Sequence, residues 1–167
     1  MRYLMCAAFI MLFTALQAQD VRLPKNERKQ FVGTWSLVTV ENTNADGSKT
    51  FPYGENPVGL LVFTDTDDYA IQILKAIRPK VAAGDKNKAT PDENAGLVQG
   101  NNSHFGTYAV DTAKHSITFN VQHAFYPNWE GNVQVRSYTL ENNVLSYVVT
   151  HTTNGGAITA TVVWRKK

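Results

Sequence analysis

The feature of this sequence that most restricts its fold is a series of short stretches rich in β-branched and aromatic residues. Such stretches predict strands, because these side chains pack well on a pleated surface. We expect nine strands, at residues 33–40, 48–51, 58–64, 69–75, 104–110, 116–126, 132–140, 144–153 and 157–165. Short turn sequences separate most of them, and the Asp46-Gly47 pair is typical of a hairpin turn. The pattern therefore indicates an antiparallel meander.

The order of these strands favours a closed barrel. Closing a meander on itself removes the exposed edges that would otherwise pair with another chain. A β-sandwich is the alternative, because strand spacing alone does not separate the two architectures. One helix is expected from Thr90 to about Gln99, since Thr90 is a capping residue, Pro91 follows it and Glu93 completes a capping box. We predict an all-β protein with a single antiparallel up-and-down barrel of about eight or nine strands and one short helix.

The N-terminus predicts a signal peptide. Arg2 precedes an apolar run at residues 4–16, and small Ala18 follows it. The run has the length of a signal-peptide core and is too short to span a bilayer, although an uncleaved anchor helix is the alternative. We predict a signal peptide at 1–18, an N-terminal arm at 19–30 and a barrel domain at 31–167. The protein is then exported, to a periplasm or to the medium.

Charge and cysteine content exclude several classes of function. The chain has 16 Lys and Arg against 14 Asp and Glu, so it lacks the basic excess of a nucleic-acid-binding protein. Its only cysteine, Cys6, lies in the predicted signal peptide, so the mature chain forms no disulfide and no thiolate site. No later stretch is long and apolar enough to be a transmembrane segment. We expect no metal and no cofactor, because the four histidines are dispersed and the acidic run at 65–68 lacks the spacing of a calcium loop.

Several motifs resemble those of a known family. Gly33-Thr34-Trp35 opens the first predicted strand, and Arg165 lies in the last. Two longer stretches, at 53–64 and at 125–131, carry the more specific likeness. Together they resemble the bacterial and fungal lipocalin-like domain family, which has a calycin-type β-barrel, over roughly residues 31–165. The resemblance implies a barrel with an internal cavity, and a base where the Arg165 guanidinium stacks on Trp35 beside Gly33.

Six residues are candidates for ligand contact: Tyr69, Tyr108, His123, Trp129, Arg136 and Tyr138. Arg136 and Tyr138 lie two residues apart in one strand and share a face with Gln134. If that face looks inward, the pair binds a carboxylate or another polar oxygen of an otherwise apolar ligand. The opposite face, with Val133 and Val135, is the alternative inner face, and Arg136 and Tyr138 are then a surface pair.

The other four candidates each have two interpretations. His123 shares a strand face with Phe119 and Val121, which predicts burial, either as a hydrogen-bonded core residue or as an acid or base in the cavity. Trp129 follows a Pro-Asn turn and either caps the barrel mouth or closes its hydrophobic end. Tyr69 and Tyr108 add hydroxyl groups to the cavity.

Three functions are compatible with these observations. The first is binding of a small hydrophobic or amphipathic molecule, largely apolar, in a cavity of about 300 Å³ or more. The second is a cofactor-independent isomerase, cyclase or hydrolase for a small lipophilic substrate, with His123 as its acid or base. No standard catalytic motif is present, so no catalytic residue is assigned. The third is a structural or interaction domain whose barrel is filled by its own side chains.

Overall fold

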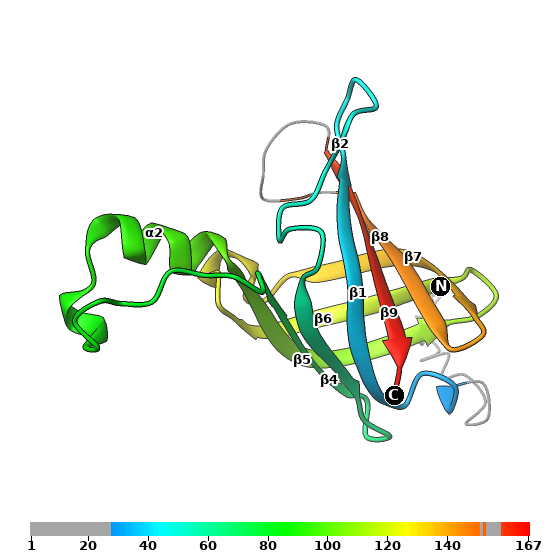
Figure 1. The fold of residues 1–167 in the computed structure, drawn as a ribbon. Coiled ribbons are helices and arrows are strands. Elements are labelled where there is room, and N and C mark those ends of the chain that lie inside the picture. The colour runs from blue at the N-terminus through cyan, green and yellow to red at the C-terminus, as the bar shows by residue number, and fades with distance from the viewer. Residues whose placement is uncertain (1–27, 151, 153–157) are drawn as a thin grey trace, which may run out of the picture.

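The chain forms a closed antiparallel β-barrel (Figure 1). The computed structural model describes residues 28–150, 152 and 158–167, so the predicted signal peptide and most of the predicted arm lie outside the described residues. The strands are β1 (Gly33–Thr43), β2 (Lys49–Thr50), β3 (Val58–Phe63), β4 (Asp68–Leu74), β5 (Asn101–Asp111), β6 (Ser116–Ala124), β7 (Val133–Glu141), β8 (Val144–Val149) and β9 (Thr159–Lys166). Pairing of β1 with β9 closes the sheet, which confirms the barrel and excludes the sandwich.

Eight strands build the wall, and the short strand β2 is an addition to it. β1 pairs with β3 through its first four residues and with β9 along most of its length. β2 pairs only with Asn42 and Thr43, at the far end of β1. β8 ends at Val149, earlier than the sequence predicts, and part of the predicted strand end at 150–153 lies outside the described residues.

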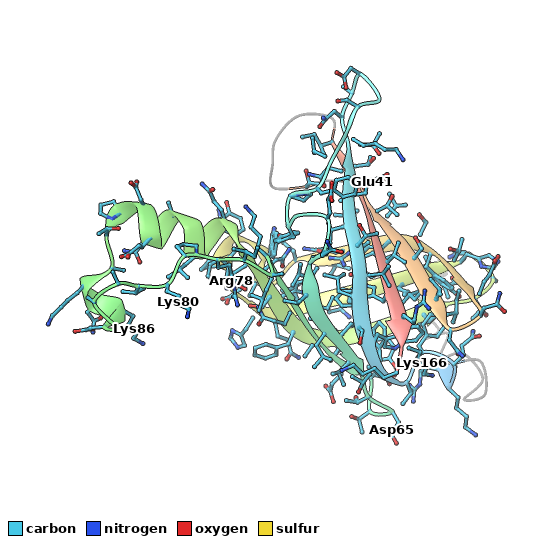
Figure 2. The ribbon with its side chains drawn as sticks, in the orientation of Figure 1. Glu41, Asp65, Arg78, Lys80, Lys86 and Lys166 are labelled. Carbon is cyan, nitrogen blue, oxygen red and sulfur yellow. The ribbon has the colours of Figure 1, made fainter. Side chains whose placement is uncertain are left out.

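The predicted helix is confirmed as α2 (Pro91–Gln99). The Thr90 hydroxyl accepts a hydrogen bond from the Glu93 amide at 3.2 Å, and the Glu93 carboxylate accepts one from the Thr90 amide at 2.8 Å. This capping box satisfies amides that the first helical turn leaves free. The helix, with the 3-10 turn η1 (Lys86–Lys88), projects from the barrel in the connection between β4 and β5 (Figures 1 and 2). No residue of α2 is buried.

Aromatic side chains fill one end of the barrel, which we call the base: Phe31, Trp35, Phe63, Tyr108 and Tyr138. All five are buried. The rings of Phe31 and Tyr138 meet edge to face with their centroids 5.1 Å apart, and the Trp35 indole donates a hydrogen bond to the Phe31 carbonyl at 2.9 Å. Phe31, just before β1, therefore helps to close the barrel at its base.

The cation at the base is not the predicted one. Arg165 is exposed, because its neighbour Trp164 faces inward and successive strand residues point to opposite faces. Lys166 takes the place over the Trp35 ring, with its Nζ 5.4 Å from the ring centroid, and it donates a hydrogen bond to the Gln30 carbonyl at 2.8 Å. Gly33 has a φ of 130°, and a Cβ added there would lie 3.2 Å from the Lys166 side chain. Trp35 is thus correctly placed at the base, and Arg165 is not.

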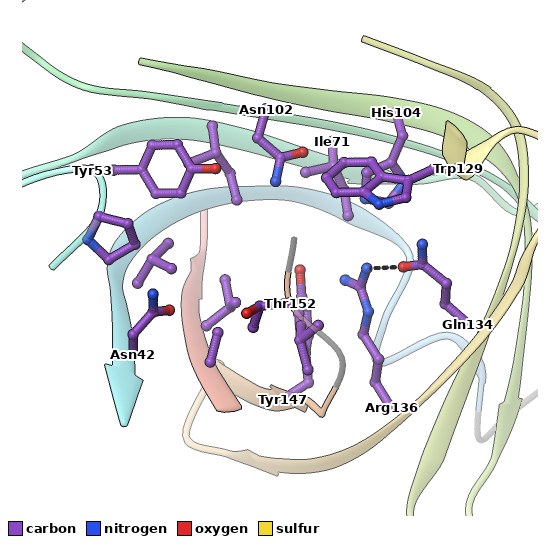
Figure 3. Close-up of a pocket in the computed structure, with 16 residues that line it drawn as sticks. Asn42, Tyr53, Ile71, Asn102, His104, Trp129, Gln134, Arg136, Tyr147 and Thr152 are labelled. Atoms are coloured by element: carbon purple, nitrogen blue, oxygen red, sulfur yellow. Dashed lines mark hydrogen bonds between the residues drawn. The ribbon is translucent and has the colours of Figure 1, made fainter. Parts of the chain in front are cut away.

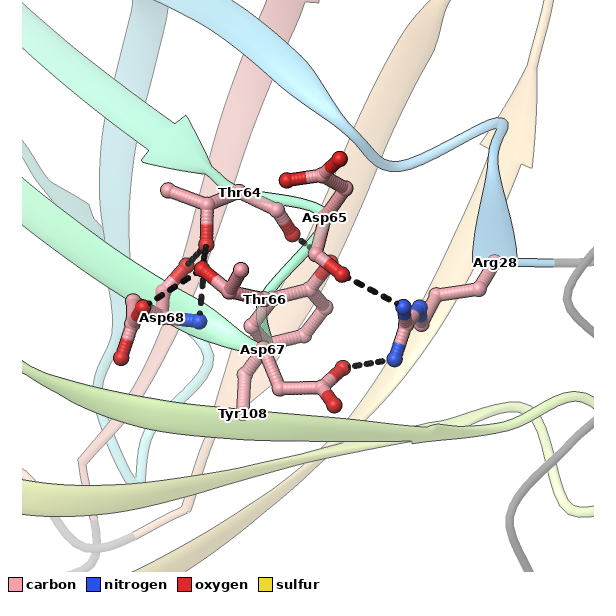
Figure 4. Close-up of polar contacts among 7 residues, drawn as sticks. All are labelled: Arg28, Thr64, Asp65, Thr66, Asp67, Asp68 and Tyr108. Carbon is pink, nitrogen blue, oxygen red and sulfur yellow. Dashed lines mark hydrogen bonds and ion pairs between the residues drawn. The ribbon is translucent and has the colours of Figure 1, made fainter.

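The acidic turn between β3 and β4 binds the end of the arm (Figure 4). Arg28 forms an ion pair with Asp67 and donates a hydrogen bond to the Asp65 carbonyl at 2.7 Å. The Tyr108 hydroxyl donates to the Thr64 carbonyl at 2.9 Å. Within the described part of the chain, no group of three His, Cys, Asp or Glu residues has an arrangement that could hold a metal ion.

Candidate functional site

The half of the barrel opposite the base, which we call the mouth half, contains a cavity of about 90 Å³ (Figure 3). Its apolar wall includes Ile71, Ile73 and Val162, and its polar groups come from Asn42, Asn102, His104, Gln134, Arg136 and Tyr147. Trp129 and Tyr53 also line it. The volume is smaller than the roughly 300 Å³ expected for a site that encloses a drug-sized ligand. The hollow part of the barrel thus has room for a small chemical group and a few carbons.

Arg136 is the one charged residue among those that line this cavity. It lies in β7, where Gln134, Arg136 and Tyr138 face inward and Val133 and Val135 face outward. Only 6% of its surface is exposed, and its guanidinium carbon lies 4.5 Å from the Phe119 ring centroid and 4.8 Å from that of Tyr147. The two rings therefore hold the guanidinium plane in place.

The hydrogen bonds of Arg136 are incomplete. Its Nη2 donates to the Gln134 side-chain oxygen at 2.5 Å, and its buried Nε has no acceptor. No Asp or Glu of the described segments forms an ion pair with it. An unpaired charge in a protein interior is unfavourable by several kcal/mol. Arg136 therefore presents an unneutralised cation beside the cavity.

A second polar pair, His104 and Tyr69, lies next to Arg136. His104 is 4% exposed, and its Nδ1 is 2.7 Å from the Tyr69 hydroxyl oxygen. Burial, with a smaller contribution from the Arg136 charge, lowers the pKa of His104 to about 3. Burial also raises the pKa of Tyr69 well above its ordinary value. Both side chains are consequently neutral at neutral pH.

The Tyr69 contact determines which nitrogen of His104 carries the proton. Among the described residues, the Tyr69 hydroxyl has no hydrogen-bond partner other than His104 Nδ1. A buried hydroxyl that does not donate is unfavourable, so Tyr69 donates to Nδ1 and the ring proton lies on Nε2. His104 then acts as a neutral hydrogen-bond donor at the cavity and is a poor base.

Comparison with known families agrees with this architecture. A family model described as a lipocalin-like domain matches residues 32–167. The chain belongs to the lipocalin-like domain family. The match includes every strand of the barrel and all residues that line the cavity. No curated protein sequence matches the chain.

The lipocalin-like barrel brings three of the six candidate ligand residues together. Arg136 and Trp129 line the cavity, and Tyr69 lies behind His104. The short 3-10 helix η2 (Pro127–Trp129) places the Trp129 ring at the mouth, with its centroid 5.9 Å from that of His104. The mouth-capping interpretation of Trp129 agrees with this position.

Two predicted tyrosines lie in the base and do not line the cavity. Tyr108 faces inward, but its hydroxyl bonds to the Thr64 carbonyl in the β3–β4 turn. Burial raises the pKa of Tyr108 to about 12, so it too is neutral. Tyr138 packs against Phe31. Arg136 and Tyr138 both point inward, as one of the two alternatives predicted. Arg136 lines the cavity in the mouth half, whereas Tyr138 lies in the base.

His123 was predicted to be buried, and this is wrong. Its side chain is 67% exposed on the outer face, with Nδ1 3.5 Å from the Glu130 carboxylate. The reason is an irregularity in the pairing of β5 with β6: Phe105 pairs with His123, but the next residue, Gly106, pairs with Val121. One extra residue in β6 reverses the inward–outward alternation after Val121. His123 is therefore not available as an acid or base in the cavity.

The sequence prediction missed His104. It lies four residues before Tyr108 in the same strand and therefore on the same face, so the interior position assigned to Tyr108 also implied one for His104. Tyr147 was missed as well, although it lies two residues after Leu145 in an apolar strand and therefore on the same face. Tyr53 and Asn102 approach the cavity from a loop and a strand end, and no pattern in the sequence indicated this.

Proposed function

We propose that this lipocalin-like protein is exported and binds a small, largely apolar molecule with an acidic group, which lies against Arg136. One observation carries the proposal: Arg136 is a buried cation at a cavity and has no carboxylate partner in the described chain. An anion from outside the chain would neutralise it. The apolar run at residues 4–16 supports export.

The donors around the cavity favour a carboxylate over other polar groups. The guanidinium rests against the rings of Phe119 and Tyr147 and lines the cavity, and no carboxylate of the described residues neutralises it. His104 offers its Nε2 proton without a charge. A guanidinium forms a charge-assisted hydrogen bond with a carboxylate, and such a bond is stronger than one to a neutral oxygen.

The rest of the wall supports an apolar body for the ligand. Ile71, Ile73 and Val162 are nearly fully buried around the cavity. An apolar group gains free energy when it leaves water for such a wall. Binding fits the residues better than acid–base catalysis does, because His104 is a poor base and His123 lies outside the barrel.

Calorimetric titration of the mature protein with hexanoate and with 1-hexanol tests the proposal. We expect hexanoate to bind more tightly than 1-hexanol. In Arg136→Met the hexanoate affinity should fall about 10- to 100-fold, since a hydrogen bond to a charged group contributes about 1.5–3 kcal/mol. Arg165→Met, which removes an exposed arginine, is the matched control and should leave the affinity unchanged.

The proposal is wrong if hexanoate and 1-hexanol bind equally well, or if Arg136→Met binds hexanoate as the native protein does. Native mass spectrometry of the protein purified from its own cell envelope provides an independent check. A released small molecule with an acidic group is the expected result.

A further inference from the structure

The barrel wall is open on one side of Arg136. β7 extends from Val133 to Glu141 and β8 from Val144 to Val149, but only Tyr138–Glu141 pairs with Val144–Tyr147. Beyond the pair of Tyr138 and Tyr147 the two strands separate. Continued pairing would place Val149 opposite Arg136, and this pairing is absent. The mouth half of β7 therefore has a free edge toward β8.

A groove occupies the space between the separated strands. Its volume is about 350 Å³, and Val133, Val135 and Thr150 line it on the outer side. Trp129, Gln134, Arg136 and Val149 line both the groove and the interior cavity. Figure 3 shows Trp129, Gln134 and Arg136 together at one side of the cavity. Within the described segments, these shared side chains adjoin both spaces.

The groove has the volume that the cavity lacks, and its lining mixes aliphatic with polar side chains. The cavity holds about 90 Å³, whereas the groove reaches the roughly 300 Å³ typical of small-molecule sites. Val133 and Val135 are 63% and 62% exposed, so the groove offers two large aliphatic side chains to an apolar chain. A cation inside the wall and aliphatic side chains outside it complement the two ends of an amphiphile.

We propose that the ligand is a single-chain carboxylic acid whose tail leaves the barrel between β7 and β8 and lies along Val133 and Val135. The inference rests on the proposed function, because the carboxylate remains at Arg136. It adds the class of ligand, an acid with an unbranched tail longer than the cavity. It also adds a route, since the tail passes the Gln134–Arg136 pair and Trp129.

The test is a titration of the mature protein with straight-chain acids from butanoate to dodecanoate. Once the cavity is full, each further CH₂ group should raise the affinity roughly threefold, because it enters the groove and not water. Val135→Asn should lower the affinity for decanoate severalfold and leave that for butanoate unchanged, because it makes the groove polar without adding a charge beside Arg136. Val58→Asn is the matched control, an outward valine of β3 that is 46% exposed and lines neither space.

A second measurement does not depend on a variant. Decanoate with a nitroxide label at its last carbon should broaden the methyl NMR signals of Val133 and Val135 far more than those of Val58. A tail that stays inside the barrel, or that leaves through the top of the mouth, would not give this pattern.

The failures of the two proposals are distinguishable. If short acids bind through Arg136 but the affinity stops rising with chain length, the tail does not use the groove and only the present inference is overturned. The same follows if Val135→Asn and Val58→Asn behave alike toward decanoate. If no acid of any length binds to the native protein, the proposed function fails, and the inference falls with it.

Discussion

The base and the mouth half of this barrel are built from the same strands and differ in how completely they are packed. In the base, Trp35 is fully buried and its indole nitrogen has an acceptor. In the mouth half, buried polar atoms of Asn102 and Arg136 have none, and the indole nitrogen of Trp164, which does not line the cavity, also has none. The inward side chains of the same strands thus form a packed core in the base. In the mouth half they leave a cavity with unpaired polar groups. The charged group among these, Arg136, lies in the half where we propose that the ligand binds.

The largest expected difference between the two halves concerns their tryptophans. Trp35→Ala should lower the free energy of unfolding by about 3–5 kcal/mol, because it leaves a cavity in the base and removes the bond to Phe31. Trp129→Ala, at the partly exposed mouth, should lower it by about 1 kcal/mol or less. Urea denaturation followed by circular dichroism measures both. Equal losses would mean that the mouth is part of the stabilising core.

Acidification should weaken the mouth half through His104. Its pKa is about 3 in the folded chain and near 6.5 when unfolded, so the unfolded chain takes up the proton first. Stability due to neutral His104 is complete above pH 6.5 and is lost as the pH falls toward 3, by roughly 3 kcal/mol at pH 4. His104→Gln should therefore lose less stability than the native protein between pH 7 and pH 4.

Urea denaturation at the two pH values provides the measurement for His104. His123→Gln is the control, because this exposed histidine contacts water in both states. If His104→Gln and the native protein lose stability equally between pH 7 and pH 4, His104 is not held neutral by its surroundings.

Removing the unpaired charge should stabilise the ligand-free protein. Arg136→Met replaces a buried cation with an apolar side chain of similar length, and we expect the free energy of unfolding to rise by about 1–2 kcal/mol. The same change should weaken acid binding, so stability and binding move in opposite directions. Thermal unfolding without ligand measures the effect. A loss of stability would show that the stacking on Phe119 and Tyr147 outweighs the unfavourable burial.

The smallest effect concerns the cation at the base. Lys166→Ala should lower the free energy of unfolding by about 0.5–1 kcal/mol, because it removes the contact of Nζ with the Trp35 ring. Arg165→Ala should change it by less than about 0.5 kcal/mol, since that side chain is exposed. Thermal unfolding of the two variants side by side decides between them. The reverse order would restore Arg165 as the residue on Trp35.

Local rules made most of the fold predictable. The capping box at Thr90 and Glu93 acts within four residues, and a strand of alternating side chains needs only its own sequence to show two faces. The order of the strands followed because short turns join neighbours. The membership in the lipocalin-like family was visible in contiguous motifs for the same reason.

The site was predicted less well, because it depends on pairing between strands. His123 faces outward owing to an irregular register opposite Gly106, where a Cβ would lie 2.1 Å from the Asn120 carbonyl oxygen. Nothing within β6 alone shows this. Tyr108 and Tyr69 both face inward, yet one belongs to the base and the other adjoins the site. The stagger of the strands decides how far along the barrel axis each inward side chain lies. This stagger is a property of the closed sheet and not of one strand.

The order of amino acids was enough to predict the strands, the helix with its cap, the antiparallel order and an arginine on one face of β7. Each of these depends on interactions between residues close in the chain. The folded barrel was needed to establish that this face points inward, that Arg136 has no acidic partner among the described residues and that β7 and β8 separate beside it. Those properties arise where strands distant in sequence meet, because register, stagger and closure are set by the whole barrel.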